Sequence, residues 1–373
     1  MKLGQFITDD DVWELEPYTN WQDNYLFWCK KYMQDKIGQL STRFLKDEES
    51  FDLLVDQIEK TKNIDELKNT INDLSKIKVK GAKSYFIALY KFYYFLEKVE
   101  ASNLKEIENK VIKAFIISLD SEEKKVNEVT KSNIMVRVKN FLSYISNHNI
   151  KNGESFDFKI TISAKDVIKT KHKKVEIISP DKEFSDFLKG IDEVKFKYNN
   201  IRNKLLLKII LFTGMRVSEV TYLKYKDIEL NGKNFSFNIV GKGNKERTLY
   251  VAKKDIGYLW DAYIKEVPIT NYDNYAFPNS KGEPIADRTM TNFIRKILVM
   301  KNIKTTKNSS HLLRHSLASA LIYEGEHSLQ DVSFLLGHQN ISTTQIYIHN
   351  TNEHIKKTSS GISSVLNKKN KKR

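Results

Sequence analysis

The sequence predicts a mainly α-helical protein with one small antiparallel β-hairpin, divided into two domains. A length of 373 residues is typical of two domains. Apolar residues recur at helical spacing through most of the chain. The stretch F-S-F-N-I-V-G-K-G-N-K-E-R-T-L-Y-V alternates on both sides of a glycine-containing turn, which indicates a hairpin. A hydrophobic content of 40% is sufficient for real cores.

The composition favours a nucleic-acid partner. The chain carries 62 basic and 47 acidic residues, a net charge of +15, although a Lys-rich proteome would give a similar excess. The single cysteine, Cys29, excludes a disulfide framework and a Cys-rich zinc site, and it suits a reducing compartment. No apolar run is long enough to span a membrane, and the N-terminus lacks a signal-peptide core. We therefore expect a cytoplasmic protein.

The first half is expected to contain a helical extension, residues 1–70, and a second helical region, residues 71–165. Helices are predicted near 80–98, 103–119 and 130–147. The aromatic stripe of the first of these is more typical of a core than of a ligand platform. The third packs its apolar side chains inward and leaves three cations free for solvent or phosphates: Lys131, Arg137 and Lys139.

Residues 166–180 are predicted to be a basic linker, because K-T-K-H-K-K occupies 169–174. A lysine run is usually just a solvated segment, but between two domains it can also follow a DNA backbone. The second domain is expected to span residues 181–350. The final K-K-N-K-K-R is typical of a disordered tail.

Two arginines of the second domain occupy conspicuous positions. A buried helix is expected to end at Gly214, and Arg216 begins the next helix, where a helix N-terminus favours an anion. In H-L-L-R-H at 311–315, His311 and Arg314 share one helix face, although an ordinary exposed polar face would look the same. Because a guanidinium fork matches two phosphate oxygens, the two arginines could hold one phosphodiester from both sides.

Three further residues lie at the ends of predicted elements. Lys242 lies at the hairpin tip, where it is either an ordinary surface lysine or a mobile proton donor. A capping box starts the helix that ends at Gly337, and His338 follows at the turn. Tyr347 falls on the next predicted helix, nine positions after His338.

These pieces together resemble the tyrosine recombinases, specifically the Xer-type site-specific recombinases. The matching motifs are T-G-M-R-V-S-E, G-K-G-N-K-E-R, H-L-L-R-H-S, L-L-G-H and the tyrosine at 347. The resemblance is close in the C-terminal half and looser from about 80 to 150. The long N-terminal segment points to a single-recombinase branch such as XerH. The resemblance implies a two-domain C-shaped DNA clamp, with a helical SAM-like core-binding domain (71–165) and a tyrosine recombinase catalytic domain (181–350).

The resemblance also implies a chemistry, in which Tyr347 attacks a DNA phosphodiester and forms a 3′-phosphotyrosine. Positive side chains neutralise the transition state, so that neither a metal, a cofactor nor ATP is required. Lys242 would protonate the 5′ leaving oxygen, and His311 would assist proton transfer at the tyrosine. The implied catalytic set is Arg216, Lys242, His311, Arg314, His338 and Tyr347, with Glu219 in a supporting role.

The implied partners are a double-stranded DNA recombination site, a second copy of the chain on that site, and a homotetramer in the synaptic complex. An FtsK-type DNA translocase is a further expected partner, and no membrane is involved. Lys245 and Arg247 are expected to contact the DNA backbone. Residues 351–373 are expected to contain a segment that docks on a neighbouring copy, followed by the basic tail, although a frayed terminus fits nearly as well.

Three other functions remain open at this point. A mobile-element or phage integrase would share every catalytic residue with a recombinase that resolves chromosome dimers. A type IB topoisomerase uses related chemistry but acts as a monomer. A DNA-binding regulator that has lost catalysis is a different class, and the complete set of catalytic residues argues against it.

Overall fold

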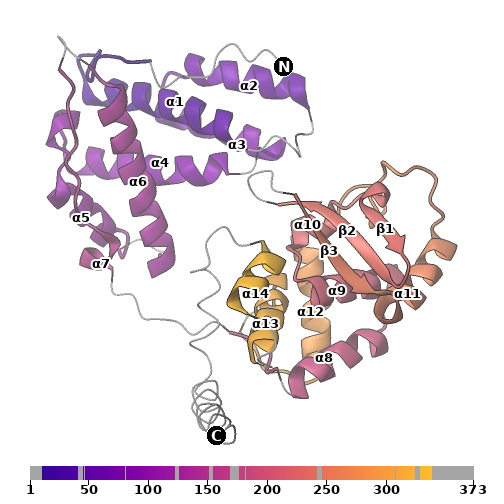
Figure 1. Ribbon diagram of the computed structural model, residues 1–373. Coiled ribbons are helices and arrows are strands. Elements are labelled where there is room, and N and C mark those ends of the chain that lie inside the picture. Colours follow the sequence, from indigo (N-terminus) through magenta and orange to yellow (C-terminus); the bar gives the residue numbers. More distant parts are fainter. Residues whose placement is uncertain are drawn as a thin grey trace, which may run out of the picture. The chain divides into compact units, whose positions relative to one another are not determined.

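The structure is a computed structural model, and it describes residues 11–40, 45, 47–79, 81–121, 126–150, 154–168, 176–180, 182–241, 246–306, 308–323 and 328–337. The chain forms two compact units, residues 1–172 and 173–373 (Figure 1). Within the described residues, no helix is both long enough and apolar enough to cross a membrane.

The first unit is built from helices. They are α1 (Trp21–Gln39), α2 (Glu48–Lys60), α3 (Ile64–Lys76), α4 (Ala82–Lys98), a short 3-10 turn η1 (Leu104–Glu106), α5 (Asn109–Ser118), α6 (Glu128–His148) and α7 (Ala164–Val167). Four helices begin at an Asn or Asp whose side chain accepts a backbone N–H of the first turn: Asn20, Asp47, Asn63 and Asn127. The sequence therefore fixes where these helices start.

One hydrophobic core runs through this unit, from Leu15 to Ile168. Helix α1 contacts both α4 and α6, and Tyr25 of α1 donates its hydroxyl hydrogen to the Leu89 carbonyl of α4 at 2.8 Å. The predicted division between 1–70 and 71–165 has no counterpart in this packing, because α1 supplies a central part of the shared core. The aromatic stripe of α4 belongs to this core, as predicted.

The described ends of the predicted linker, 166–180, are packed rather than extended. Ile168 is buried in the core of the first unit. On the other side, Ile178 is buried in the core of the second unit, and its N–H donates to Ser316 Oγ at 2.8 Å. The lysine-rich run 169–174 lies outside the described residues.

The second unit combines helices with a small sheet. Its elements are α8 (Lys182–Glu193), α9 (Asn200–Thr213), α10 (Val217–Thr221), the 3-10 turn η2 (Tyr225–Asp227), β1 (Ile228–Asn231), β2 (Asn234–Val240), β3 (Glu246–Ala252), α11 (Lys253–Glu266), α12 (Asp287–Met300), α13 (Ser310–Tyr323) and α14 (Leu329–Leu336). The predicted hairpin is β2 and β3, and β1 adds a third antiparallel strand in the order β1-β2-β3. The short strand β1 was not predicted.

Helix α9 holds the second unit together. It is almost entirely buried, and it contacts α8, α11, α13 and the strand β3 (Figure 1). Its end at Gly214 has a φ of +65°, a left-handed conformation that glycine adopts without strain. Gly337 ends α14 in the same conformation, also at +65°. Both helix ends were predicted, and both lead directly into predicted site residues.

Candidate functional site

Arg314 is the most enclosed residue of the candidate active site. It lies on α13 with only 3% of its surface exposed. Its Nη1 donates to the Gly214 carbonyl at 2.6 Å, and its Nη2 donates to the Leu336 carbonyl. These two acceptors lie two residues before Arg216 and two residues before His338 in the chain. Arg314 therefore joins the end of α9 to the end of α14.

Arg216 is held by a carboxylate one helical turn later. Its Nη1 donates to Glu219 Oε1 at 2.9 Å, and its backbone N–H donates to Glu219 Oε2 at 2.8 Å. The Arg216 side chain is 30% exposed, whereas that of Glu219 is 5% exposed. Arg216 precedes the first residue of the five-residue helix α10, as predicted, and an anion-binding role of that helix start stays a prediction. What positions Arg216 is the Glu219 carboxylate.

The same carboxylate binds a second arginine. Arg247 on β3 donates from Nη1 to Glu219 Oε1 at 3.1 Å and from Nη2 to Glu219 Oε2 at 3.0 Å. Only 9% of the Arg247 side chain is exposed. It is thus a buried bidentate partner of Glu219, and the expectation that it lies open for a DNA phosphate is wrong. This sharing was not predicted.

The alternation of buried and exposed residues along β3 indicates that Arg247 faces inward, a signal that the prediction from the sequence overlooked. Arg247 has the same parity along the strand as the buried Leu249 and Val251, while Glu246, Thr248 and Tyr250 are exposed. Alternate residues of a strand lie on the same face. The sequence pattern therefore indicates an inward-facing Arg247.

The ionisation of Glu219 follows from these contacts. Burial raises the pKa of its carboxyl group, but the hydrogen bonds from Arg247 and from the Arg216 backbone, together with the charges of both arginines, outweigh burial. The net result is a pKa below the ordinary glutamate value. Glu219 is accordingly a carboxylate at neutral pH.

Gly337 packs directly against Arg247. A Cβ atom placed on Gly337 would lie 2.9 Å from both Cζ and Nη1 of the Arg247 guanidinium. A side chain at this position would require the guanidinium to move, and glycine adopts the φ of +65° without the strain of other residues. The residue before His338 is therefore fixed against the Arg247–Glu219 pair.

His311 lies on the first turn of α13, and its side chain is exposed, unlike that of Arg314. Its ring is stacked on that of His315, with the centroids 6.2 Å apart. The neighbouring Leu312 and Leu313 are buried in the core of the second unit. His311 and Arg314, two of the predicted site residues, thus lie on the same helix, α13.

Four predicted site residues lie outside the described residues: Lys242, Lys245, His338 and Tyr347. The C-terminal docking segment, 351–373, also lies outside them. The structure therefore joins Arg216 and Arg247 through Glu219, and it bonds Arg314 to the carbonyl of Gly214, two residues before Arg216. The roles of the other four residues stay predictions.

The three cations predicted on α6 are bound within their own unit. Lys131 is only 5% exposed, and its Nζ contacts Asp120 at 2.5 Å and Glu128 at 3.1 Å. The prediction that it is free for phosphates is therefore wrong. The spacing of Glu128 and Lys131, three residues apart on a helix, indicates such a pair.

Arg137 and Lys139 are partly exposed. Arg137 Nη2 donates to Ser84 Oγ at 3.1 Å, and its guanidinium lies 5.6 Å from the centre of the Tyr85 ring. Lys139 Nζ donates to the Ile162 carbonyl at 2.7 Å. A DNA contact by either residue stays a prediction.

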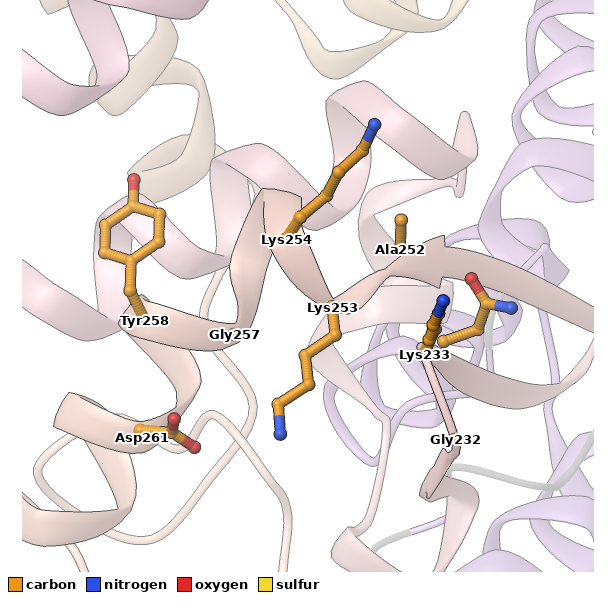
Figure 2. Close-up of a pocket in the computed structure, with 9 residues that line it drawn as sticks. Gly232, Lys233, Ala252, Lys253, Lys254, Gly257, Tyr258 and Asp261 are labelled. Carbon is orange, nitrogen blue, oxygen red and sulfur yellow. The ribbon is translucent and has the colours of Figure 1, made fainter.

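A pocket of about 830 Å³ lies away from these residues, at the start of α11. Figure 2 shows Lys253 and Lys254 in the first turn of that helix, with Tyr258 and Asp261 further along it. The other wall of the pocket is the turn between β1 and β2, at the end of β2 that is remote from the hairpin tip. The pocket contains none of the predicted catalytic residues, so we do not assign the active site to it.

Among the described residues, no group of three or more His, Cys, Asp or Glu side chains is arranged to hold a metal ion.

Comparisons with known proteins agree with this geometry. Residues 180–354 match the model of the phage integrase family, and residues 17–149 match the phage integrase SAM-like domain. The tyrosine recombinase XerH of Campylobacter jejuni is 31% identical over 342 residues, which cover 90% of this chain and 94% of the relative. The chain belongs to the phage integrase family of tyrosine recombinases.

The likeness to members of the recombinase family extends over nearly the whole chain. The tyrosine recombinase XerH of Helicobacter pylori is 27% identical over 348 residues, covering 90% of this chain and 94% of the relative. A crystal structure of a XerH site-specific recombinase, bound to a palindromic difH substrate after cleavage, has a TM-score of 0.82. That comparison covers 93% of this chain and 98% of the other, at 26% identity.

The family resemblance and the fold class predicted from the sequence are both confirmed. The chain is a site-specific tyrosine recombinase, and hence a DNA strand-transferring enzyme. The SAM-like match begins at residue 17, which agrees with the single core that includes α1.

Proposed function

We propose that this recombinase cuts and rejoins DNA through a 3′-phosphotyrosine at Tyr347, and that its target is a dif-like site at which chromosome dimers are resolved. The observation that carries the proposal is the bridge made by Arg314. Its 2.6 Å hydrogen bond to Gly214 and its bond to Leu336 join the ends of α9 and α14, which precede Arg216 and His338 by two residues in the sequence. This arrangement supports the proposal that cations from distant parts of the sequence act on one phosphodiester.

The chemistry is a transesterification. The phenolic oxygen of Tyr347 forms a bond to phosphorus while the bond from phosphorus to the 5′ oxygen breaks. His311 takes up the phenolic proton, and Lys242 supplies a proton to the 5′ oxygen. A tyrosine with an ordinary pKa near 10 is a weak nucleophile at neutral pH, so this proton transfer is needed. A 5′-hydroxyl from another strand reverses the step and reseals the DNA.

Arg216 and Arg314, with His338, stabilise the charge that develops on the non-bridging phosphate oxygens. Preorganised donors of this kind contribute about 3 kcal/mol each in other enzymes. Because these positive groups do the neutralising, the proposed reaction requires neither a divalent metal nor ATP. Cleavage in the presence of EDTA would support this, and a strict Mg²⁺ requirement would contradict it.

The relatives support the proposed target. Crystal structures of XerH have been determined with difH DNA before and after cleavage, which supports a dif-like DNA site for this chain. We extend the proposal to a dimer on one site and a tetramer in the synaptic complex, acting on chromosomal DNA in the cytoplasm. We also propose that an FtsK-type DNA translocase activates the complex. A site near the replication terminus, away from phage genes, would separate this role from that of a mobile-element integrase.

A nicked suicide substrate that carries the candidate site tests the chemistry. The wild-type chain should form an SDS-resistant protein–DNA adduct, and Tyr347→Phe should form none. Tyr250→Phe is the matched control, because Tyr250 is an exposed tyrosine of β3, and it should form the adduct normally. An adduct that survives Tyr347→Phe would show that another residue is the nucleophile.

A further inference from the structure

The carboxylate of Glu219 is shared between two arginines, and this sharing has a consequence for charge. Both oxygens of Glu219 accept a hydrogen bond from Arg247, at 3.1 and 3.0 Å. Oε1 also accepts one from the Arg216 side chain at 2.9 Å. Two guanidinium groups and one carboxylate leave the cluster with one net positive charge.

The exposed part of this cluster is Arg216. Its side chain is 30% exposed, compared with 9% for Arg247 and 5% for Glu219. An incoming phosphate therefore meets Arg216, behind which the other two groups lie buried. If Arg247 were absent, the buried carboxylate would have Arg216 as its main counter-charge, and the pair would be neutral toward the phosphate.

We propose that Arg247 is a positioning residue, which neutralises Glu219 so that Arg216 keeps its positive charge for the scissile phosphate. The inference rests on the proposed function and deepens it, since Arg247 acts through Glu219 and Arg216 and does not touch the reacting atoms. It assigns to Arg247 a role other than the DNA-backbone contact expected from the sequence.

Two further observations support a positioning role. The Nε of Arg247 is buried, and it has no hydrogen-bond partner among the described residues. Leaving a buried donor unpaired is unfavourable, so the bidentate geometry toward Glu219 is maintained in spite of that cost. In addition, the guanidinium is packed against Gly337, where a Cβ would approach to 2.9 Å. Arg247 therefore also fixes the backbone that precedes His338.

Charge-balancing substitutions test the inference on the full-length chain. In single-turnover cleavage of the suicide substrate, Arg247→Gln should be slower than wild type by about 10- to 100-fold, less than the loss typical of a donor that touches the charge directly. The double variant Arg247→Gln with Glu219→Gln removes both buried charges and leaves that of Arg216 unopposed. It should cleave at least about fivefold faster than Arg247→Gln alone, because contacting residues are not additive.

Three controls accompany these variants. Arg247→Lys keeps the charge without the bidentate fork, and it should recover part of the rate lost in Arg247→Gln. Arg295→Gln removes one charge from an exposed position of α12, and it should cleave at the wild-type rate. Melting temperatures show whether each variant is folded.

A second measurement does not need DNA. The Glu219 carboxyl signal can be followed by NMR as the pH is varied, and its pKa should be higher in Arg247→Gln than in wild type, because the hydrogen bonds and charge that lower it are lost. A wild-type chain that forms no adduct would contradict the proposed function itself. A wild-type rate in Arg247→Gln, an unchanged Glu219 pKa, or a folded double variant no faster than the single would each overturn only the positioning role.

Discussion

The two arginines of the site are held in different ways. Arg314 is buried between α13 and the ends of α9 and α14, and it donates hydrogen bonds to the backbone carbonyls of Gly214 and Leu336. Arg216 is partly exposed beside α10, and it is held by the carboxylate of Glu219. Neutral carbonyls orient a guanidinium without cancelling its charge. A carboxylate orients it and cancels it, unless a second cation is present.

The charge of the Glu219 carboxylate accounts for the additional arginine, Arg247, beside Arg216. Backbone carbonyls become available where two helices end, at Gly214 and Gly337, since the last carbonyls of a helix lack partners within it. At α10 the acceptor is an ionised side chain, and Arg247 balances it. Positioning an anion-binding arginine therefore requires different surroundings according to the charge of its acceptor.

The largest expected effect is that of Arg314→Gln, because it acts on both stability and catalysis. Removing the guanidinium weakens or breaks its bonds to two buried carbonyls, which should lower the free energy of unfolding by about 2–4 kcal/mol. Cleavage in folded protein should fall by about 100-fold or more. Thermal melting and single-turnover adduct formation measure the two effects. A fully stable but inactive variant would show that the carbonyl bonds contribute little.

Arg216→Gln should have a similar effect on cleavage but a much smaller one on stability. The side chain is 30% exposed, so its loss leaves fewer buried groups unpaired. We expect a decrease of about 100-fold in cleavage and of no more than about 1 kcal/mol in unfolding free energy. An equal loss of stability in Arg216→Gln and Arg314→Gln would contradict the proposed difference in how the two arginines are held.

Gly337→Ala tests the contact between α14 and Arg247. The added methyl group would meet the guanidinium at 2.9 Å, on a backbone with a φ of +65°. Gly232→Ala is the control, because its φ is +59° and no atom lies within 4 Å of its Cβ position. Both variants should lose about 1 kcal/mol from backbone strain, and only Gly337→Ala should also slow cleavage. Identical behaviour of the two alanines would argue that the contact has no role.

The smallest expected effect is on the acid dependence of stability. The folded-state pKa of Glu219 lies below its ordinary value, so its stabilising contribution is complete above the unfolded pKa, about 4.3. It is lost as the pH falls through the folded-state pKa. Glu219→Gln should therefore show a shallower decrease in unfolding free energy below about pH 4.3 than wild type. Denaturant titrations across this range measure it, and superimposable pH profiles would contradict it.

Much of the fold could be predicted from the sequence because the signals are local. The helix spanning α4, the ends at Gly214 and Gly337, and the strands around the hairpin turn all follow from periodicity and turn chemistry over a few residues. The pairing of α1 with the core of the first unit was not predicted, because it depends on contacts between residues far apart, such as Tyr25 and Leu89.

The site was predicted in part, for a similar reason. Motifs gave the identity of Arg216, Glu219 and Arg314, but not what holds them. The acceptors of Arg314 are backbone carbonyls, which any residue carries, so the sequence contains no sign of them. The surroundings of Arg247 and Lys131 were misjudged because each was treated as a surface cation, although strand parity and the spacing from Glu128 indicate buried pairs.

The central claim is that Arg216 and Arg314 meet the negative charge of one scissile phosphate. A suicide substrate with a methylphosphonate at the scissile position, which removes that charge, tests it most directly. On the ordinary phosphodiester, Arg216→Ala and Arg314→Ala should each slow adduct formation by about 100-fold or more relative to wild type. On the methylphosphonate, the same variants should lag behind wild type by less than about tenfold, since less negative charge develops on its one non-bridging oxygen than on the two of the phosphodiester. Equal defects on both substrates would contradict the account.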